Sequence, residues 1–197
     1  MTDTVIDFIR HGEPVGGRAY RGHGIDDPLN EKGWQQMWRA VGEQCPWTHI
    51  ITSPLQRCKA FADELAARHG LSVSVDDRLR EVGFGEWEGK TPDQLKQERL
   101  DEYLAFYSDP VNNRPPGAED LDAFIDRVVE SYHYIAKHYA DKHTLVVTHA
   151  GVMRAIIAHV VHAEPLGLYR IKVDNAGITR IRINERGPML EYHNLAL

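Results

Sequence analysis

The sequence predicts an α/β fold, a three-layer α/β/α sandwich around a mostly parallel sheet. Short apolar runs of strand character alternate along the chain with segments whose apolar residues recur at helical spacing. The run HTLVVTH at residues 143–149 is apolar throughout its middle, as expected of a buried parallel strand. The 197 residues suffice for a domain with a substantial core, and we expect residues 1–197 to form a single domain.

Composition and charge exclude several classes of protein. Hydrophobic residues make up 42% of the chain and charged residues 26%, which is a globular composition. The net charge of -6 argues against nucleic acid as the main partner. No apolar run approaches the length of a membrane span, and residues 1–10 lack the basic and apolar regions of a secretory signal. Cys45 and Cys58 show no metal-type spacing and fit a reducing compartment, so we expect a cytoplasmic protein that binds neither nucleic acid nor membrane.

The first predicted elements are a strand, a loop and a helix. The strand covers residues 4–9, because the apolar run there breaks at Gly12 and Pro14. A glycine-rich loop, VGGRAYRGHGIDDP, follows at residues 15–28. The next segment is predicted to be a helix, because its apolar residues recur at helical spacing: Trp34, Met37, Trp38 and Val41.

A second strand, THIITS, is predicted at residues 48–53. Ser53, Pro54 and Gln56 then match an N-cap, a proline at the first helical position and a glutamine at the third, which is the pattern of a capping box. This pattern predicts a helix that holds Arg57 in its first turn, directly after a strand.

Further along the chain, that helix is expected to end near Gly70, and a third strand to cover residues 71–75. The stretch EVGFGEWEGKT is predicted to be a loop. Thr91 and Gln94 repeat the capping signature and predict a helix that runs to about Tyr107.

The C-terminal half continues the alternation. A long amphipathic helix is predicted over residues 124–139, followed by the strand at 143–149 and a helix over 150–161. Two β-like segments, LYRIKV at 168–173 and GITRIRI at 177–183, complete the pattern. Strands that alternate with helices favour a parallel sheet with helices on its faces.

Three of the predicted strands end in polar residues. Arg10 and His11 follow the first strand. Arg57 follows the second, and His149 follows the most apolar one. Ligands of such sheets bind at the carboxyl ends of the strands, so these side chains converge if the three strands are neighbours.

A pocket that holds these side chains would suit a phosphoryl group. Arg10 and Arg57 are fixed cations whose forked donors match phosphate oxygens. A histidine beside such cations has its pKa lowered and stays neutral, so it could attack phosphorus and form a phosphohistidine. A carboxylic acid such as Glu81 could protonate the leaving alkoxide and later activate water. Because the protein itself supplies this positive potential, we expect no metal and no cofactor.

Four motifs carry a resemblance to a known family: RHGEP, SPLQR, LREVGFGEWEG and VVTHAGVMR. In this order they resemble the signature set of the histidine phosphatase superfamily, the clan of cofactor-dependent phosphoglycerate mutases and acid phosphatases. The resemblance implies a phosphoglycerate mutase-like fold. It also implies that His11 is the covalent nucleophile and that Glu81 is the proton donor. The other members of the implied catalytic set are Arg10, Arg57 and His149.

The resemblance further implies a phosphate site that extends into the late motif, where Ala150 stands in place of a glycine that the family often has. Its implied members are Arg10, His11, Arg57, His149, Ala150 and Gly151. Arg21, Gly22 and Trp87 are candidates for substrate contact. Of the remaining carboxylates, Glu119 is interpreted, like Glu13, as a supporting partner or a solvated charge.

The segment between WEG and PPG is short and holds few cations, whereas mutases of this clan carry a longer and more basic insert there. The resemblance therefore implies hydrolysis of a small-molecule phosphomonoester. It is closest to the α-ribazole phosphatase-like branch, with α-ribazole 5'-phosphate as one candidate substrate. The alternatives are phosphoglycerate mutase-type phosphotransfer, a phosphate-binding member that has lost catalysis, and a zinc hydrolase that uses His11 and His149. The oligomeric state stays open, a homodimer included.

Overall fold

A computed structural model describes residues 3–195 and contains a six-stranded sheet in the order β3-β2-β4-β1-β5-β6. The pairs β2–β3, β2–β4 and β1–β4 are parallel, whereas β5 is antiparallel to β1 and β6 is antiparallel to β5. The prediction of a mostly parallel sheet is therefore confirmed. The strands are β1 Thr4–Arg10, β2 His49–Thr52, β3 Val73–Val75, β4 His143–Thr148, β5 Ile178–Asn184 and β6 Gly187–Leu195.

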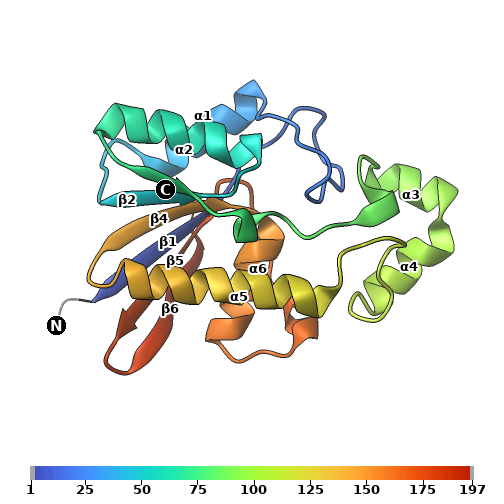
Figure 1. Cartoon of the computed structure of the whole chain (residues 1–197). Coiled ribbons are helices and arrows are strands. Elements are labelled where there is room, and N and C mark those ends of the chain that lie inside the picture. The colour runs from blue at the N-terminus through green and yellow to red at the C-terminus, as the bar shows by residue number, and fades with distance from the viewer. Residues whose placement is uncertain (1–2, 196–197) are drawn as a thin grey trace.

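Helices cover both faces of the sheet, as a three-layer sandwich requires (Figure 1). Helices α1 and α2 lie on one face, and α5 and α6 lie on the other. Helices α3 and α4 lie apart from the sheet, beyond the carboxyl ends of its parallel strands (Figure 1). The helices are α1 Glu31–Val41, α2 Gln56–His69, α3 Pro92–Glu98, α4 Leu100–Ser108, α5 Leu121–His138 and α6 Ala150–Val160, with short 3-10 turns at Asp77–Leu79, Gly85–Trp87 and Pro165–Arg170.

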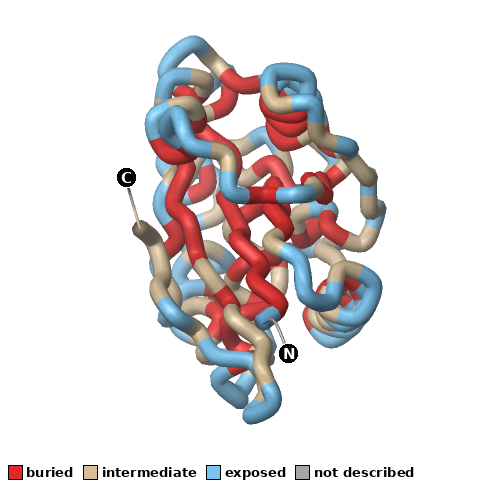
Figure 2. The backbone as a smooth tube through the Cα atoms, turned by 90° about the vertical axis from the view of Figure 1, so that its left-hand side faces the viewer, coloured by how far each residue is buried: buried red, intermediate tan, exposed pale blue. Residues whose placement is uncertain are grey.

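The central strands are apolar on both sides because each face packs against helices. Phe8 and Val146 belong to the core formed with α5 and α6. Their neighbours Ile9 and Val147 belong to the core formed with α1 and α2. Figure 2 shows these strands as buried segments through the middle of the molecule. The sheet is therefore a rigid base for the residues that follow its strands. None of the helices within residues 3–195 is long and apolar enough to cross a membrane.

The start of α2 differs from the prediction of a capping box at Ser53. The N-cap residue is Leu55, and no side chain of its own caps the helix. Instead, the Gln56 amide donates to Oδ1 of Asp26 at 2.8 Å, so a carboxylate from the glycine-rich loop caps α2. The Ser53 hydroxyl lies 2.7 Å from Nε2 of His149 and accepts from the Leu55 amide at 3.3 Å, so it holds the turn before α2 and caps no amide of the helix itself.

The helix predicted to run to Tyr107 is interrupted at Arg99. The capping box at Thr91 is confirmed, but α3 ends at Glu98 and α4 begins at Leu100. The break turns an apolar side chain of each helix toward the same place: Leu95 of α3 and Phe106 of α4 both pack against the buried Trp87. Tertiary packing therefore overrides the continuous helical pattern.

The β-like segment at 168–173 is not a strand. Its first half belongs to the 3-10 turn Pro165–Arg170, which inserts Leu168 into the core against α6. The segment at 177–183 is confirmed as β5. Strand β6 escaped prediction because it lies at the edge of the sheet, where few of its side chains are buried and the apolar pattern is weak.

Candidate active site

The three strands that end in polar residues are neighbours, as the sequence analysis required. Strand β4 lies between β2 and β1. The His11 amide donates to the Thr148 carbonyl at 2.9 Å, and the Ser53 amide donates to the Val147 carbonyl at 3.0 Å. Beyond this edge lies a cavity of about 640 Å³. Seven of the predicted residues line it: Arg10, His11, Arg21, Gly22, Arg57, Glu81 and Ala150.

His11 is held in one tautomer. Its side chain is 7% exposed, and Nδ1 lies 2.8 Å from the Gly12 carbonyl oxygen. A carbonyl oxygen only accepts, so Nδ1 carries the proton and the lone pair stays on Nε2. Burial, followed by the charges of Arg10 and Arg57, holds the pKa of His11 well below its usual range. The ring is therefore a neutral base and nucleophile near pH 7.

Two arginines are fixed at the cavity by backbone carbonyls. Arg57 is almost fully buried and donates from Nη1 to the Ile25 carbonyl at 2.9 Å and from Nη2 to the Gly22 carbonyl at 2.8 Å. Arg10 donates from Nη1 to the Val173 carbonyl at 2.7 Å, and burial lowers its pKa. Neither arginine forms an ion pair within residues 3–195. Both guanidinium groups are thus available to an anion in the cavity.

His149 is fully buried and lies behind His11 rather than in the wall of the cavity. The two ring centroids are 5.2 Å apart. Nε2 of His149 lies 2.7 Å from the Ser53 hydroxyl and 3.6 Å from Sγ of Cys58. Burial, followed by the charges of Arg57 and His11, lowers its pKa well below the usual range. The structure places this predicted site residue next to the nucleophile candidate, with Ser53 as its partner.

Glu81 borders the cavity and is anchored by two backbone amides. The Val82 amide donates to Oε1 at 3.0 Å, and the Gly151 amide donates to Oε2 at 3.2 Å. Glu81 has no ion-pair partner among the described residues, so its carboxyl group is available for proton transfer. Gly151, one of the predicted phosphate-site residues, therefore holds the carboxylate and does not line the main cavity.

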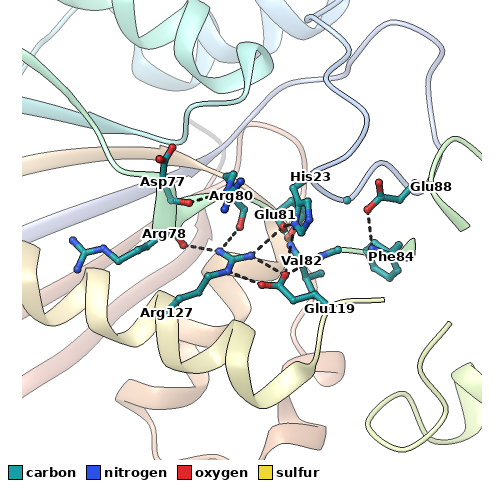
Figure 3. A network of polar contacts seen from close by, with 12 residues as sticks. His23, Asp77, Arg78, Arg80, Glu81, Val82, Phe84, Glu88, Glu119 and Arg127 are labelled. Carbon is teal, nitrogen blue, oxygen red and sulfur yellow. Dashed lines mark hydrogen bonds and ion pairs between the residues drawn. The ribbon is translucent and has the colours of Figure 1, made fainter. Parts of the chain in front are cut away.

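Arg127 clamps the loop that carries Glu81, as Figure 3 shows. Its Nη1 donates to the carbonyls of Arg78 and Arg80 at 2.6 and 2.8 Å, and its Nη2 donates to the Glu81 carbonyl at 3.2 Å. Its Nε donates to Oε1 of Glu119 at 2.7 Å. One side chain on α5 thus fixes three backbone carbonyls of the short segment 78–81. Sequence reasoning missed this role, because Arg127 occupies the polar face of an amphipathic helix like any solvated charge.

Glu119 and His23 complete this clamp (Figure 3). Glu119 accepts from the Gly83 amide at 3.0 Å, and hydrogen bonds with Arg127 hold its pKa below the usual value despite burial. His23 donates from Nδ1 to the Glu81 carbonyl at 3.0 Å. Glu119 is therefore a supporting partner of the site, one of the two interpretations that the sequence left open.

A methyl group at Gly151 is expected to displace Glu81, because a Cβ there would overlap the Glu81 carboxylate. We expect Gly151→Ala to lower kcat by about tenfold to 100-fold, the cost of a small misplacement of a reacting group. Alanine is the better helix former, so thermal unfolding should not occur at a lower temperature. Steady-state kinetics alongside calorimetry checks both points. Full activity in Gly151→Ala would show that the position of Glu81 is not critical.

Of the three candidates for substrate contact, Arg21 and Gly22 border the main cavity and Trp87 does not. Arg21 is buried, with Nε paired to Asp27 at 2.8 Å and Nη2 donating to the Val15 carbonyl at 2.7 Å, and it borders the cavity. Gly22 borders the cavity too, and its carbonyl receives Arg57. Trp87 is fully buried among aromatic side chains and does not line the cavity, so the expectation of substrate contact is wrong for this residue. Its large apolar ring supports α3 and α4 instead.

Three cations at the cavity escaped the sequence analysis: Arg18, Arg154 and Lys172. A signal for Arg154 was present, since it follows Ala150 by four residues on α6 and therefore shares its face of the helix. Arg18 lies in the glycine-rich loop, and Lys172 lies between the last turn and β5. No pattern distinguishes such loop cations from solvated ones.

Comparison with known proteins decides the family. The profile of the histidine phosphatase superfamily (branch 1) matches residues 6–196. The chain belongs to this superfamily. The resemblance carried by the four motifs is thus confirmed, and the protein is a phosphatase of the histidine phosphatase superfamily.

Relatives within the superfamily have several names. A Hydrogenobacter thermophilus protein named "Putative phosphoserine phosphatase 2" is 33% identical over 151 residues, 74% of this chain and 71% of that protein. A Salmonella choleraesuis protein named "Probable phosphoglycerate mutase GpmB" is 29% identical over 184 residues, 91% of this chain and 85% of that protein. The crystal structure of the α-ribazole phosphatase from Shigella flexneri is similar with a TM-score of 0.85 and 25% identity, covering 98% of this chain and 96% of that one. The phosphoglycerate mutase-like fold is therefore confirmed.

Proposed function

We propose that this member of the superfamily hydrolyses phosphomonoesters without a metal, through a phosphohistidine on His11. The observation that carries the proposal is the state of His11: neutral, with the proton on Nδ1 and the lone pair on Nε2. It lies in a cavity that Arg10 and Arg57 also line, and neither of these arginines forms an ion pair within residues 3–195. Neutral imidazole is a competent nucleophile toward phosphorus. Arg10 and Arg57 supply the charge that stabilises the transferring phosphoryl group.

The reaction proceeds in two displacements. In the first, Nε2 of His11 forms a bond to phosphorus while the ester P–O bond breaks, and the leaving alkoxide takes a proton from the Glu81 carboxyl group. In the second, a water molecule loses a proton to the Glu81 carboxylate and attacks phosphorus, which breaks the N–P bond. Inorganic phosphate leaves, and both residues return to their starting protonation states.

The ion pairs of three cations near α3 and α4 favour hydrolysis over mutase chemistry. Lys90 is paired with Glu98, and Lys96 lies 3.5 Å from Asp93. Arg99 is paired with Glu86. These charges are neutralised within their own segment, so they are not set to hold a second phosphate of a bisphosphate cofactor. Transfer of the phosphoryl group to water is then the natural outcome.

The substrate is a small phosphomonoester, for which the relatives suggest a first panel. We would measure phosphate release from α-ribazole 5'-phosphate, phosphoserine and 3-phosphoglycerate, with and without EDTA. A bisphosphoglycerate-dependent isomerisation assay runs alongside. Hydrolysis that persists in EDTA is expected. Isomerisation faster than phosphate release would favour the mutase alternative, and activity lost on chelation would favour a metal-dependent enzyme.

Replacement of Glu81 by glutamine tests the proton donor. Glu81→Gln keeps the size of the side chain but cannot donate a proton as an acid. We expect kcat to fall by about 100-fold, within the range of general acid–base contributions. Inorganic phosphate should still protect the variant against thermal unfolding as it protects the wild type. A parallel loss of phosphate binding would assign Glu81 a structural role instead.

A further inference from the structure

The main cavity carries more positive charge than one phosphoryl group needs. Its lining contains the cations Arg10, Arg18, Arg21, Arg57, Arg154 and Lys172. Two of these are neutralised by partners, because Arg21 is paired with Asp27 and Lys172 is paired with Asp174.

The carboxylates of the lining leave this excess in place. Glu13 is paired with Lys32, so Glu81 is the one lining carboxylate without an ion-pair partner among the described residues. A phosphoryl dianion held by Arg10 and Arg57 balances those two charges. With Glu81 in the protonated form that the proposed first displacement requires, the charge of Arg154 stays uncompensated. Arg18 is exposed, so its charge is largely screened by solvent.

Arg154 occupies a particular place relative to the reacting groups. Its Nε donates to the Ile171 carbonyl at 2.8 Å, and it forms no ion pair within residues 3–195. Its charge lowers the pKa of Arg10, so the two guanidinium groups are close enough to repel one another. A second anion beside Arg154 would offset the charge that acts on Arg10.

A second, smaller cavity of about 60 Å³ adjoins the first. Glu81, Phe84, Ala150 and Arg154 line both cavities. The remaining wall of the small cavity is mainly apolar, with Leu168 and the ring of Tyr169 among its members. Since Glu81 is the proposed donor to the departing oxygen, the groups beside it face the leaving group. The shared lining therefore places Arg154 on the side of the main cavity where the leaving group departs in the proposed reaction, beside a mainly apolar wall.

Resting on the function proposed above, we propose that the leaving group of the substrate carries a second anionic group, and that Arg154 binds it. The substrate class is an acidic phosphomonoester, such as a phosphorylated hydroxy acid or amino acid, or a bisphosphate. A neutral leaving group would leave the Arg154 guanidinium unmatched. A guanidinium binds carboxylate and phosphate through the same forked donors, so the experiment must distinguish the two.

Matched substrate pairs measure the preference directly. Phosphoserine carries a carboxylate that phosphoethanolamine lacks. Likewise, 3-phosphoglycerate carries a carboxylate where glycerol 3-phosphate has a hydroxymethyl group. Fructose 1,6-bisphosphate and fructose 6-phosphate differ by one phosphate. We expect kcat/KM to favour the acidic member of at least one pair by about tenfold or more, the usual value of one charge-assisted contact. The pair that shows the preference identifies the second group as carboxylate or phosphate.

Variants of Arg154 then assign the preference. Arg154→Met should reduce the preference ratio to near one, chiefly through KM for the acidic member, and Arg154→Lys should restore part of it. Arg186→Met is the matched control, because it removes the same charge from an exposed turn outside the cavity and should keep the wild-type ratio. A structural role for Arg154 would lower both members of a pair equally and leave the ratio unchanged.

The outcomes separate this inference from the proposed function. A wild-type protein that releases phosphate from no member of these pairs would overturn the proposed function, and this inference with it. A protein that hydrolyses them but favours the acidic member of no pair would overturn the inference alone. An Arg154→Met variant that keeps the wild-type preference for the acidic substrate would also overturn the inference alone.

Discussion

His11→Ala is expected to lower the turnover of every phosphomonoester by about three orders of magnitude or more, as removal of a covalent nucleophile does. The reason lies in the geometry of the cavity. No other unprotonated nitrogen in the described structure lines it, because His149 lies behind His11 and holds Ser53. Phosphate release from the variant and the wild type, measured at equal concentration, gives the comparison.

A trapping experiment distinguishes a lost nucleophile from a damaged fold. Acid-labile, alkali-stable label from a phosphorus-labelled substrate should appear on the wild-type chain and be absent from His11→Ala. His149→Gln is the informative companion, since it removes the neighbouring imidazole and should still take up label, though more slowly. Label retained on His11→Ala would move the nucleophile elsewhere. Hydrolysis without label on either chain would indicate direct attack by water.

The low pKa of His11 adds a pH dependence to the same prediction. Below its ordinary pKa of about 6.5, a free histidine would be protonated and unable to attack phosphorus. Burial and the flanking arginines lower the pKa of His11, so the neutral form persists to a lower pH. Activity should therefore not fall with protonation of His11 as the pH drops through that ordinary value.

The sequence predicted the strands that carry the site residues better than it predicted the hydrogen bonds of individual side chains. The apolar run at 143–149 and the strand before Arg10 predicted that His11 and His149 follow strand ends, and the strand order of the structure brings those ends together. This worked because strand pairing in a parallel sheet is governed by burial, which an apolar run records directly. The same logic failed for Ser53, whose fit to a capping box was purely local. A partner distant in sequence, His149, engaged its hydroxyl instead.

The residues that sequence reasoning misplaced all depend on contacts between distant segments. Trp87 lies in the loop of Glu81, but its ring faces Leu95 and Phe106 rather than the cavity. Arg127 reads as a solvated helix charge, yet it binds three carbonyls of a segment more than forty positions away, at separations of 49, 47 and 46 residues. Local patterns predict which elements form, whereas the direction of an individual side chain in a loop is set by tertiary packing.

Arg57→Lys should be the second most damaging change, with kcat/KM reduced by about 1000-fold, the upper end for loss of one fixed transition-state donor. The substitution keeps the charge but replaces a planar fork with a single ammonium group. Arg57 uses its two terminal nitrogens at once, one on the Ile25 carbonyl and one on the Gly22 carbonyl, while lining the cavity. One ammonium nitrogen cannot hold both carbonyls and also bind phosphate with the same geometry.

Arg57→Lys should therefore also lower the stability of the protein, because Arg57 holds the glycine-rich loop as well as the phosphate. With one carbonyl of the loop left without its buried donor, we expect a destabilisation of about 1–3 kcal/mol, measurable by chemical denaturation. Arg39→Lys is the matched control, because Arg39 is exposed on α1 and its side chain makes no ion pair or aromatic contact among the described residues. It should keep wild-type kinetics and stability. If Arg57→Lys retained near-normal kcat/KM, charge alone would suffice at this position. The forked geometry on which the proposed phosphate site depends would then be dispensable.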